Sequence, residues 1–105
     1  MDRITEYFNA FELKDINYFY DIFSEKAQLN DWDVSKSGKY NILNHYKLIF
    51  ANLKNINITL IETYSINDTD IILLKLKADG VDEIKIADFI TYENSKIIKI
   101  EAFKM

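Results

Sequence analysis

Apolar residues in the first half of the chain recur every three to four positions, the spacing that gathers side chains on one face of a helix. The first set predicts an amphipathic helix over residues 3–13: Ile4, Tyr7, Phe8 and Phe11. The second follows Asp15, which can cap a helix that runs to about residue 24: Ile16, Phe19, Ile22 and Phe23. The third predicts a helix over about residues 40–53: Ile42, Tyr46, Ile49, Phe50 and Leu53.

Two other parts of the chain alternate apolar and polar residues, which is typical of strands. Residues 27–32 predict a short strand with Ala27, Leu29 and Asp31 on its inward side, and residues 35–38 predict a loop. Four longer strands are expected after residue 56: 56–65, 69–78, 82–92 and 96–104. Their connections are short, with Asp79-Gly80 as a two-residue hairpin signal. The order of elements therefore predicts an α+β fold with an antiparallel meander.

The composition fits one folded domain over residues 1–105. The hydrophobic fraction of 49%, with 14% aromatic residues, suffices for one core. A net charge of −4 with mixed acids and bases offers no basic stripe to nucleic acid. The chain shows neither the apolar segment of a signal peptide nor a membrane span, so we expect no membrane partner and a cytoplasmic location. The absence of cysteine excludes disulfides and thiolate zinc sites.

Two aspartates interrupt apolar faces of predicted strands. Asp31 follows Ala27 and Leu29 on the same parity. Asp88 shares its face with Ile84, Ile86, Ile90 and Tyr92. A buried carboxylate that is charged and unpaired is strongly unfavourable, so each acid should be paired, hydrated or protonated. Tyr7 adds a hydroxyl group to the buried face of the first helix.

The order of these elements resembles the nuclear transport factor 2-like superfamily across the whole chain, and four segments resemble its SnoaL-like and ketosteroid isomerase-like members. The segments are Glu6-Tyr7-Phe8-Asn9-Ala10-Phe11 with Lys14-Asp15, Ala27 to Asp31, Gly38 to Tyr46, and Asp88-Phe89-Ile90-Thr91-Tyr92 with Lys96-Ile97-Ile98. The resemblance implies a cone-shaped α+β fold of the cystatin-like class. In that fold three N-terminal helices pack on a strongly curved mixed or antiparallel sheet around an apolar pocket.

The resemblance also implies roles for three residues. Asp31 matches the general base of ketosteroid isomerases, Tyr7 the phenol that holds the oxyanion, and Asp88 the acid that stays protonated. Such enzymes need no cofactor. The chain departs from the pattern at Trp32, where a proline commonly follows the base, and at Ser95, where the closing turn usually has glycine. Each of the three residues also has a structural interpretation: a core tyrosine, an acid that caps a turn, and an acid in a buried network.

Further residues are expected to form walls of the pocket: Trp32, His45, Tyr46 and Phe50. His45 can reach the pocket or merely follow the edge of its helix. A single histidine without matched ligands makes neither a metal site nor a catalytic triad, so we expect no metal. The aromatic residues have no basic groove beside them, which argues against a platform for stacking nucleic-acid bases.

Three classes of function remain open from the sequence. The domain can be an enzyme that moves protons on a small apolar carbonyl compound, a module that binds an apolar ligand, or an interaction protein whose pocket is filled. Apolar residues of outward parity on neighbouring strands predict a homodimer through the outer sheet face: Ile61, Leu73, Ala87, Phe89 and Phe103. Dimers of this kind are also what the resemblance implies.

Overall fold

Three helices form in the first half of the chain in the computed structural model, which describes residues 2–105. Helix α1 (Arg3–Leu13) begins where the Asp2 carboxylate accepts a hydrogen bond from the backbone N–H of Thr5 at 2.9 Å. Helix α2 (Ile16–Ile22) begins at the predicted cap, and α3 (Lys39–Asn52) follows Gly38. These elements confirm the three predicted helices.

The second helix is shorter than predicted. It ends at Ile22 and not near residue 24, because the backbone of Phe23 is extended and pairs with Ile97 of the last strand. The side chain of Phe23 is apolar and buried, and it continues the helical spacing of Ile16, Phe19 and Ile22, so that spacing alone could not place this boundary.

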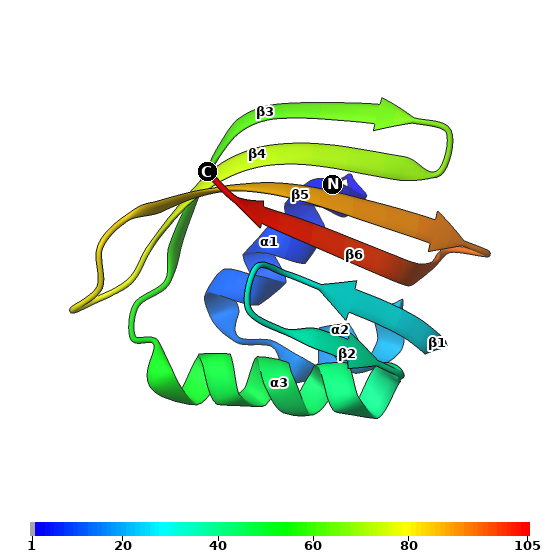
Figure 1. Ribbon diagram of the computed structural model, residues 1–105, viewed down its shortest axis with the longest axis horizontal. Coiled ribbons are helices and arrows are strands. Elements are labelled where there is room, and N and C mark those ends of the chain that lie inside the picture. Colours follow the sequence, from blue (N-terminus) through cyan, green and yellow to red (C-terminus); the bar gives the residue numbers. More distant parts are fainter. Residues whose placement is uncertain (1) are drawn as a thin grey trace.

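Six strands form one mixed sheet in the order β2-β1-β6-β5-β4-β3 (Figure 1). Their bounds are β1 Phe23–Asn30, β2 Ser35–Ser37, β3 Asn57–Ile66, β4 Thr69–Lys77, β5 Ile84–Glu93 and β6 Lys96–Lys104. The last four strands form the predicted antiparallel meander. β1 lies parallel to β6, which brings the first strand of the chain beside the last.

Two loop predictions were wrong. The expected loop at 35–38 contains the short strand β2, which pairs with β1 through Gln28 and Ser37. Its three residues are polar and exposed, so no hydrophobic alternation marks it. The expected two-residue hairpin at Asp79-Gly80 is a longer loop, because β4 ends at Lys77 and β5 begins only at Ile84.

The core lies between the helices and the inner face of the sheet. Alternation along β5 is as predicted: Ile86, Asp88, Ile90 and Tyr92 are buried, whereas Ala87 and Phe89 between them are only partly covered. Figure 1 shows α1, α2 and α3 together on one side of the sheet, with the strands wrapping over them. Within residues 2–105, no helix has the length and apolar character needed to cross a membrane.

Candidate active site

A cavity of about 290 Å³ lies between the helices and the inner face of the sheet. Its walls are mainly apolar, and its polar side chains come from α1, α3, β5 and the turn after β1: Tyr7, Asp31, Asp33, His45, Tyr46 and Asp88. Three elements that are far apart in sequence therefore bring Tyr7, Asp31 and Asp88 to one cavity. Trp32 also lines it, whereas Phe50 does not.

Phe50 belongs to an aromatic cluster behind the cavity wall. Its ring contacts those of Phe11, Phe19 and Tyr46, with centroid distances of 5.1, 6.0 and 6.0 Å. The contacts with Phe11 and Tyr46 are edge to face, a geometry that favours one orientation of each ring. Phe50 thus supports the position of Tyr46 and does not itself face a ligand.

Asp31 follows the end of β1 and organises the turn toward β2. One carboxylate oxygen, Oδ1, accepts hydrogen bonds from the backbone N–H groups of Asp33 at 2.8 Å and Val34 at 2.7 Å. The predicted strand 27–32 thus ends earlier, at Asn30, because this turn forms. Asp31 caps a turn, as its structural interpretation requires, and lines the cavity at the same time.

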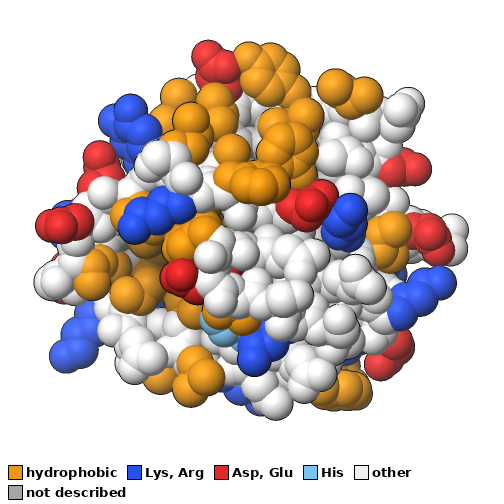
Figure 2. All heavy atoms as spheres, viewed as in Figure 1, with side chains coloured by type: hydrophobic (Ala, Val, Ile, Leu, Met, Phe, Trp, Pro, Cys, Tyr) orange, Lys and Arg blue, Asp and Glu red, His pale blue; other side chains and the backbone are white. Residues whose placement is uncertain are grey.

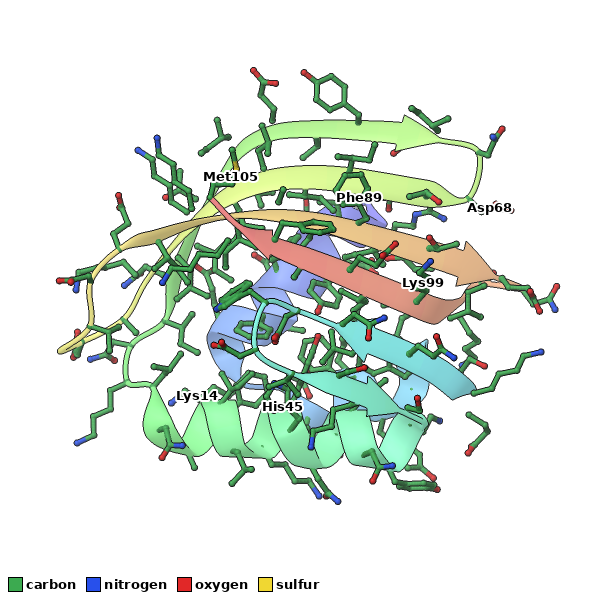
Figure 3. The ribbon with its side chains drawn as sticks, viewed as in Figure 1. Lys14, His45, Asp68, Phe89, Lys99 and Met105 are labelled. Atoms are coloured by element: carbon green, nitrogen blue, oxygen red, sulfur yellow. The ribbon has the colours of Figure 1, made fainter. Side chains whose placement is uncertain are left out.

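The second oxygen of Asp31 faces helix α3. Its Oδ2 lies 3.8 Å from Nε2 of His45, and the two side chains are only 18% and 15% exposed. Figure 3 shows His45 on the side of α3 that faces the sheet. Because Oδ1 is held by the backbone, the carboxylate cannot rotate freely, and Oδ2 remains the oxygen that a ligand can approach. Of the two positions considered from the sequence, His45 takes the one in the cavity.

Asp88 sits at the middle of β5 between Ile72 of β4 and Ala102 of β6. Its side chain is 9% exposed and has no hydrogen bond or ion pair among the described residues. Burial, and secondarily the negative charge of Asp31, raises the pKa of the Asp88 carboxyl to about 7. Near neutral pH this group can therefore carry a proton and donate a hydrogen bond into the cavity.

The hydroxyl groups of Tyr7 and Tyr46 form a hydrogen bond between α1 and α3. Burial raises the pKa of both phenols, and the nearby Asp88 charge raises each further. Both remain neutral hydrogen-bond donors over the physiological pH range. The sequence placed Tyr46 on a cavity wall, but this bond could not be predicted, because helical periodicity does not tell which two helices become neighbours.

The lining offers no evident centre for a metal ion. Nowhere in residues 2–105 do three potential side-chain ligands gather closely enough to hold one. The chemistry available in the cavity is that of carboxyl, phenol and imidazole groups, which transfer protons and donate or accept hydrogen bonds.

Comparisons with known proteins find solved structures of similar fold. No protein-family model matches the sequence, and no curated protein matches it significantly. A solved structure of a proposed polyketide cyclase from Sinorhizobium meliloti matches with a TM-score of 0.84 and 16% identity, over 94% of this chain and 91% of that one. A nuclear transport factor 2-like protein of unknown function from Cytophaga hutchinsonii matches with a TM-score of 0.82 and 10% identity, over 97% and 86%. A proposed isomerase of the SnoaL-like family from Agrobacterium tumefaciens reaches 0.80 and 13%, over 97% and 94%.

At these identities the likeness establishes the fold. The chain has the nuclear transport factor 2-like α+β fold, with three helices on a six-stranded mixed sheet. This confirms the fold predicted from the order of helices and strands. One fold supports many unrelated activities, so the function has to be argued from the cavity.

Proposed function

We propose that this domain catalyses proton transfer on a small apolar carbonyl compound without a cofactor, as an isomerase or a cyclase. The observation that carries the proposal is the meeting of Tyr7, Asp31 and Asp88 in one apolar cavity. The solved structures of similar fold include proteins described as a proposed polyketide cyclase and a proposed isomerase. That description agrees with the chemistry that the cavity offers.

Asp31 acts as the base in this mechanism. Its Oδ2 takes a proton from the carbon beside the substrate carbonyl, while the turn holds Oδ1 in place. A carboxylate fixed by two backbone donors loses little freedom when the substrate binds, which favours transfer in a defined direction. His45, 3.8 Å from Oδ2, lies where it can stabilise the negative charge of the carboxylate.

Tyr7 and Asp88 act as donors to the carbonyl oxygen as it becomes negative. The bond with Tyr46 orients the Tyr7 hydroxyl, and the raised pKa of Asp88 keeps a proton on its carboxyl group near neutral pH. The apolar walls exclude water, so each donor acts more strongly than it would in solution.

Exchange of carbon-bound hydrogen for deuterium tests this proposal without knowledge of the product. Enolisable cyclic ketones are incubated with the protein in D₂O, and loss of the α-proton signal is followed by NMR. We expect exchange with the wild-type protein, none above background with Asp31→Asn, and rates about 100- to 1000-fold lower with Tyr7→Phe or Asp88→Asn.

Asp33→Asn is the matched control, because Asp33 also lines the cavity but its side chain is exposed. It should keep most of the exchange rate. Equal activity of wild-type protein and a folded Asp31→Asn variant would contradict the assignment of the base.

The outer face of the sheet supports a second proposal, the homodimer. Phe89 and Phe103 pack edge to face at 5.8 Å, and Phe103 is 53% exposed. Apolar side chains are also exposed on the outer side of β3 at Tyr64 and Ile66, and at the bulge residue Ile61. Figure 2 shows this apolar patch gathered over β3, β4 and β5. We propose that a second copy of the chain covers it, because so large an apolar patch is rarely left in water.

Sedimentation tests the homodimer. The wild-type protein should sediment as a dimer, and Phe103→Lys should shift it toward the monomer. Leu48→Lys, at an exposed position on α3, is the control and should remain dimeric. A wild-type protein that stays monomeric at all concentrations would rule the interface out. The single-domain organisation and the cytoplasmic location remain predictions from the sequence.

A further inference from the structure

We infer that the cavity binds small organic cations, molecules with an apolar body and a protonated or quaternary amine. This inference shares the cavity with the proposed function but does not depend on turnover there. It rests on the charges of the lining, on one carboxyl group that lacks a partner, and on the aromatic walls.

The charges that face the cavity are mostly negative. Asp31, Asp33 and Asp88 line it, and no lysine or arginine of the described chain does. His45 is the one lining residue that can become positive, and it already lies beside Asp31. A ligand with a carboxylate or phosphate would meet like charges in a medium of low dielectric constant, whereas a cation would be attracted.

Asp88 is the carboxyl group with which a bound cation would form an ion pair. It is nine-tenths buried, it opens into the cavity, and no side chain of residues 2–105 pairs with it. Buried carboxylates are normally paired with a positive group. Arg3 cannot serve, because both its Nε and Nη2 donate to Asp70. An ammonium group beside Asp88 would supply the missing partner.

The aromatic walls suit the rest of such a ligand. Phe8, Phe11 and Trp32 line the cavity together with Tyr7 and Tyr46. The face of an aromatic ring attracts an organic cation, and tryptophan does so most strongly. The volume of about 290 Å³ is at the small end for ligand sites, so it suits an amine on a single ring.

Binding of a cation should depend on pH. The ionisable groups that line the cavity with Asp88 are Asp31 and Asp33 from the turn, His45 and Tyr46 from α3, and Tyr7 from α1. The pKa of Asp88 is raised to about 7 in the free protein, and a neighbouring cation favours its ionised form. Affinity for the cation should therefore rise as the pH rises toward 7 and level off above it.

Three matched six-ring probes test the inference: cyclohexylammonium, cyclohexanol and cyclohexanecarboxylate. Binding is measured by NMR titration at about pH 8 and constant ionic strength, where an aliphatic amine stays protonated as lysine does. We expect the ammonium to bind at least about tenfold more tightly than the alcohol, and the carboxylate to bind most weakly. N,N,N-trimethylcyclohexylammonium checks that the charge, and not an N–H donor, is recognised.

The Asp88→Asn variant separates this inference from a general preference for positive charge. It should lose about tenfold or more of the affinity for the ammonium and keep the affinity for the alcohol. It should also lose most of the pH dependence, which would assign that dependence to Asp88. Asp82→Asn, an exposed acid on the loop before β5, is the control and should change neither.

Equal affinity for alcohol and ammonium, no binding of either cation, or unchanged ammonium affinity in Asp88→Asn would each overturn the inference. The exchange of ketone protons is measured on the same sample. A protein that exchanges these protons but does not prefer cations refutes only this inference. A protein that prefers cations but exchanges no protons refutes only the proposed catalysis.

Discussion

Two aspartates are buried on the inner face of the sheet, and their surroundings are opposite. Asp70 on β4 is 1% exposed and accepts hydrogen bonds from Nε of Arg3 at 2.7 Å and from Nη2 at 2.9 Å. Ser65 donates a third bond at 2.7 Å. Asp88 on β5 is nearly as buried and has no such partner. In register, Asp70 lies opposite Ile90 and Asp88 opposite Ile72, so the two acids occupy diagonal positions on adjacent strands.

The comparison separates two uses of a buried acid on neighbouring strands. Asp70 joins the first turn of α1 to the start of β4, and its three donors compensate for the loss of water. Asp88 faces a cavity, and nothing compensates for its charge, so its pKa rises to about 7. The first arrangement stabilises the fold, whereas the second lowers stability and leaves a reactive group.

The largest expected effect comes from removing the uncompensated acid. The folded protein holds the proton of Asp88 up to a pH of about 7, whereas the unfolded chain releases it near 3.8, the ordinary pKa of an aspartate. Between these values the folded state binds more protons, so its stability falls as the pH rises, by roughly 4 kcal/mol in total. Asp88→Asn should raise the free energy of unfolding by about 2 to 4 kcal/mol at pH 8 and leave it unchanged near pH 3.

Urea denaturation of both proteins across this pH range measures the difference. Asp82→Asn serves again as the exposed control and should follow the wild-type protein. A variant no more stable than wild type at pH 8 would mean that Asp88 is compensated in solution.

The next largest effect should come from breaking the compensated pair. Arg3→Met keeps an aliphatic chain over the ring of Tyr92, which Arg3 now covers at 4.0 Å, but leaves Asp70 without its partner. We expect a loss of about 3 kcal/mol, the lower end for a broken buried pair, because 41% of the Arg3 side chain is exposed to water.

The double variant Arg3→Met with Asp70→Asn is the control, and it should recover part of the loss because no buried charge remains. Guanidinium denaturation at neutral pH gives both values. If Arg3→Met were as stable as wild type, Asp70 would have another source of compensation.

The contrast between the two acids was only half predictable from the sequence. Asp88 stood out because it interrupts a run of isoleucines at strand parity, and its inward position was confirmed. Asp70 was not singled out, and its partner Arg3 lies 67 residues away. Alternation tells which side of a strand is buried, but not which charged side chain from another element will reach it.

The position of Asp31 in its turn shows the same limit. The alternation predicted that the first strand includes Asp31. In the structure Asp31 lies in a turn, where its carboxylate accepts hydrogen bonds from two backbone N–H groups further along the chain. Local bonds between a side chain and the backbone leave little trace in hydrophobic alternation. The four long strands were predicted to within two residues of their observed ends, because short polar connections separate runs of nine or ten residues rich in apolar side chains.

A third effect concerns the hydroxyl groups near the two acids. Tyr46→Phe should leave the buried hydroxyl of Tyr7 without its partner. We expect a loss of about 2 kcal/mol in the free energy of unfolding, within the range for an unsatisfied buried group. Thermal denaturation measures it, with Tyr40→Phe as the control at an exposed position on the same helix. If Tyr46→Phe lost no more stability than Tyr40→Phe, the bond between Tyr7 and Tyr46 would contribute no more than an exposed hydroxyl group does.

The smallest expected effect is a gain in stability, although the change is again the removal of a tyrosine hydroxyl group. The hydroxyl group of Tyr92 lies near Arg3 and Asp70 and has no hydrogen-bond partner among the described residues. Burial raises the pKa of this phenol, so it stays neutral and contributes no charge to the cluster. Tyr92→Phe keeps the ring under Arg3 and removes only the unsatisfied oxygen, so stability should rise by about 1 kcal/mol. Chemical denaturation of Tyr92→Phe and Tyr46→Phe in parallel measures both changes in the free energy of unfolding. If both variants were less stable than wild type, the Tyr92 hydroxyl would have a hydrogen-bond partner in solution. The region around Asp70 would then be more fully hydrogen-bonded than its side chains alone suggest.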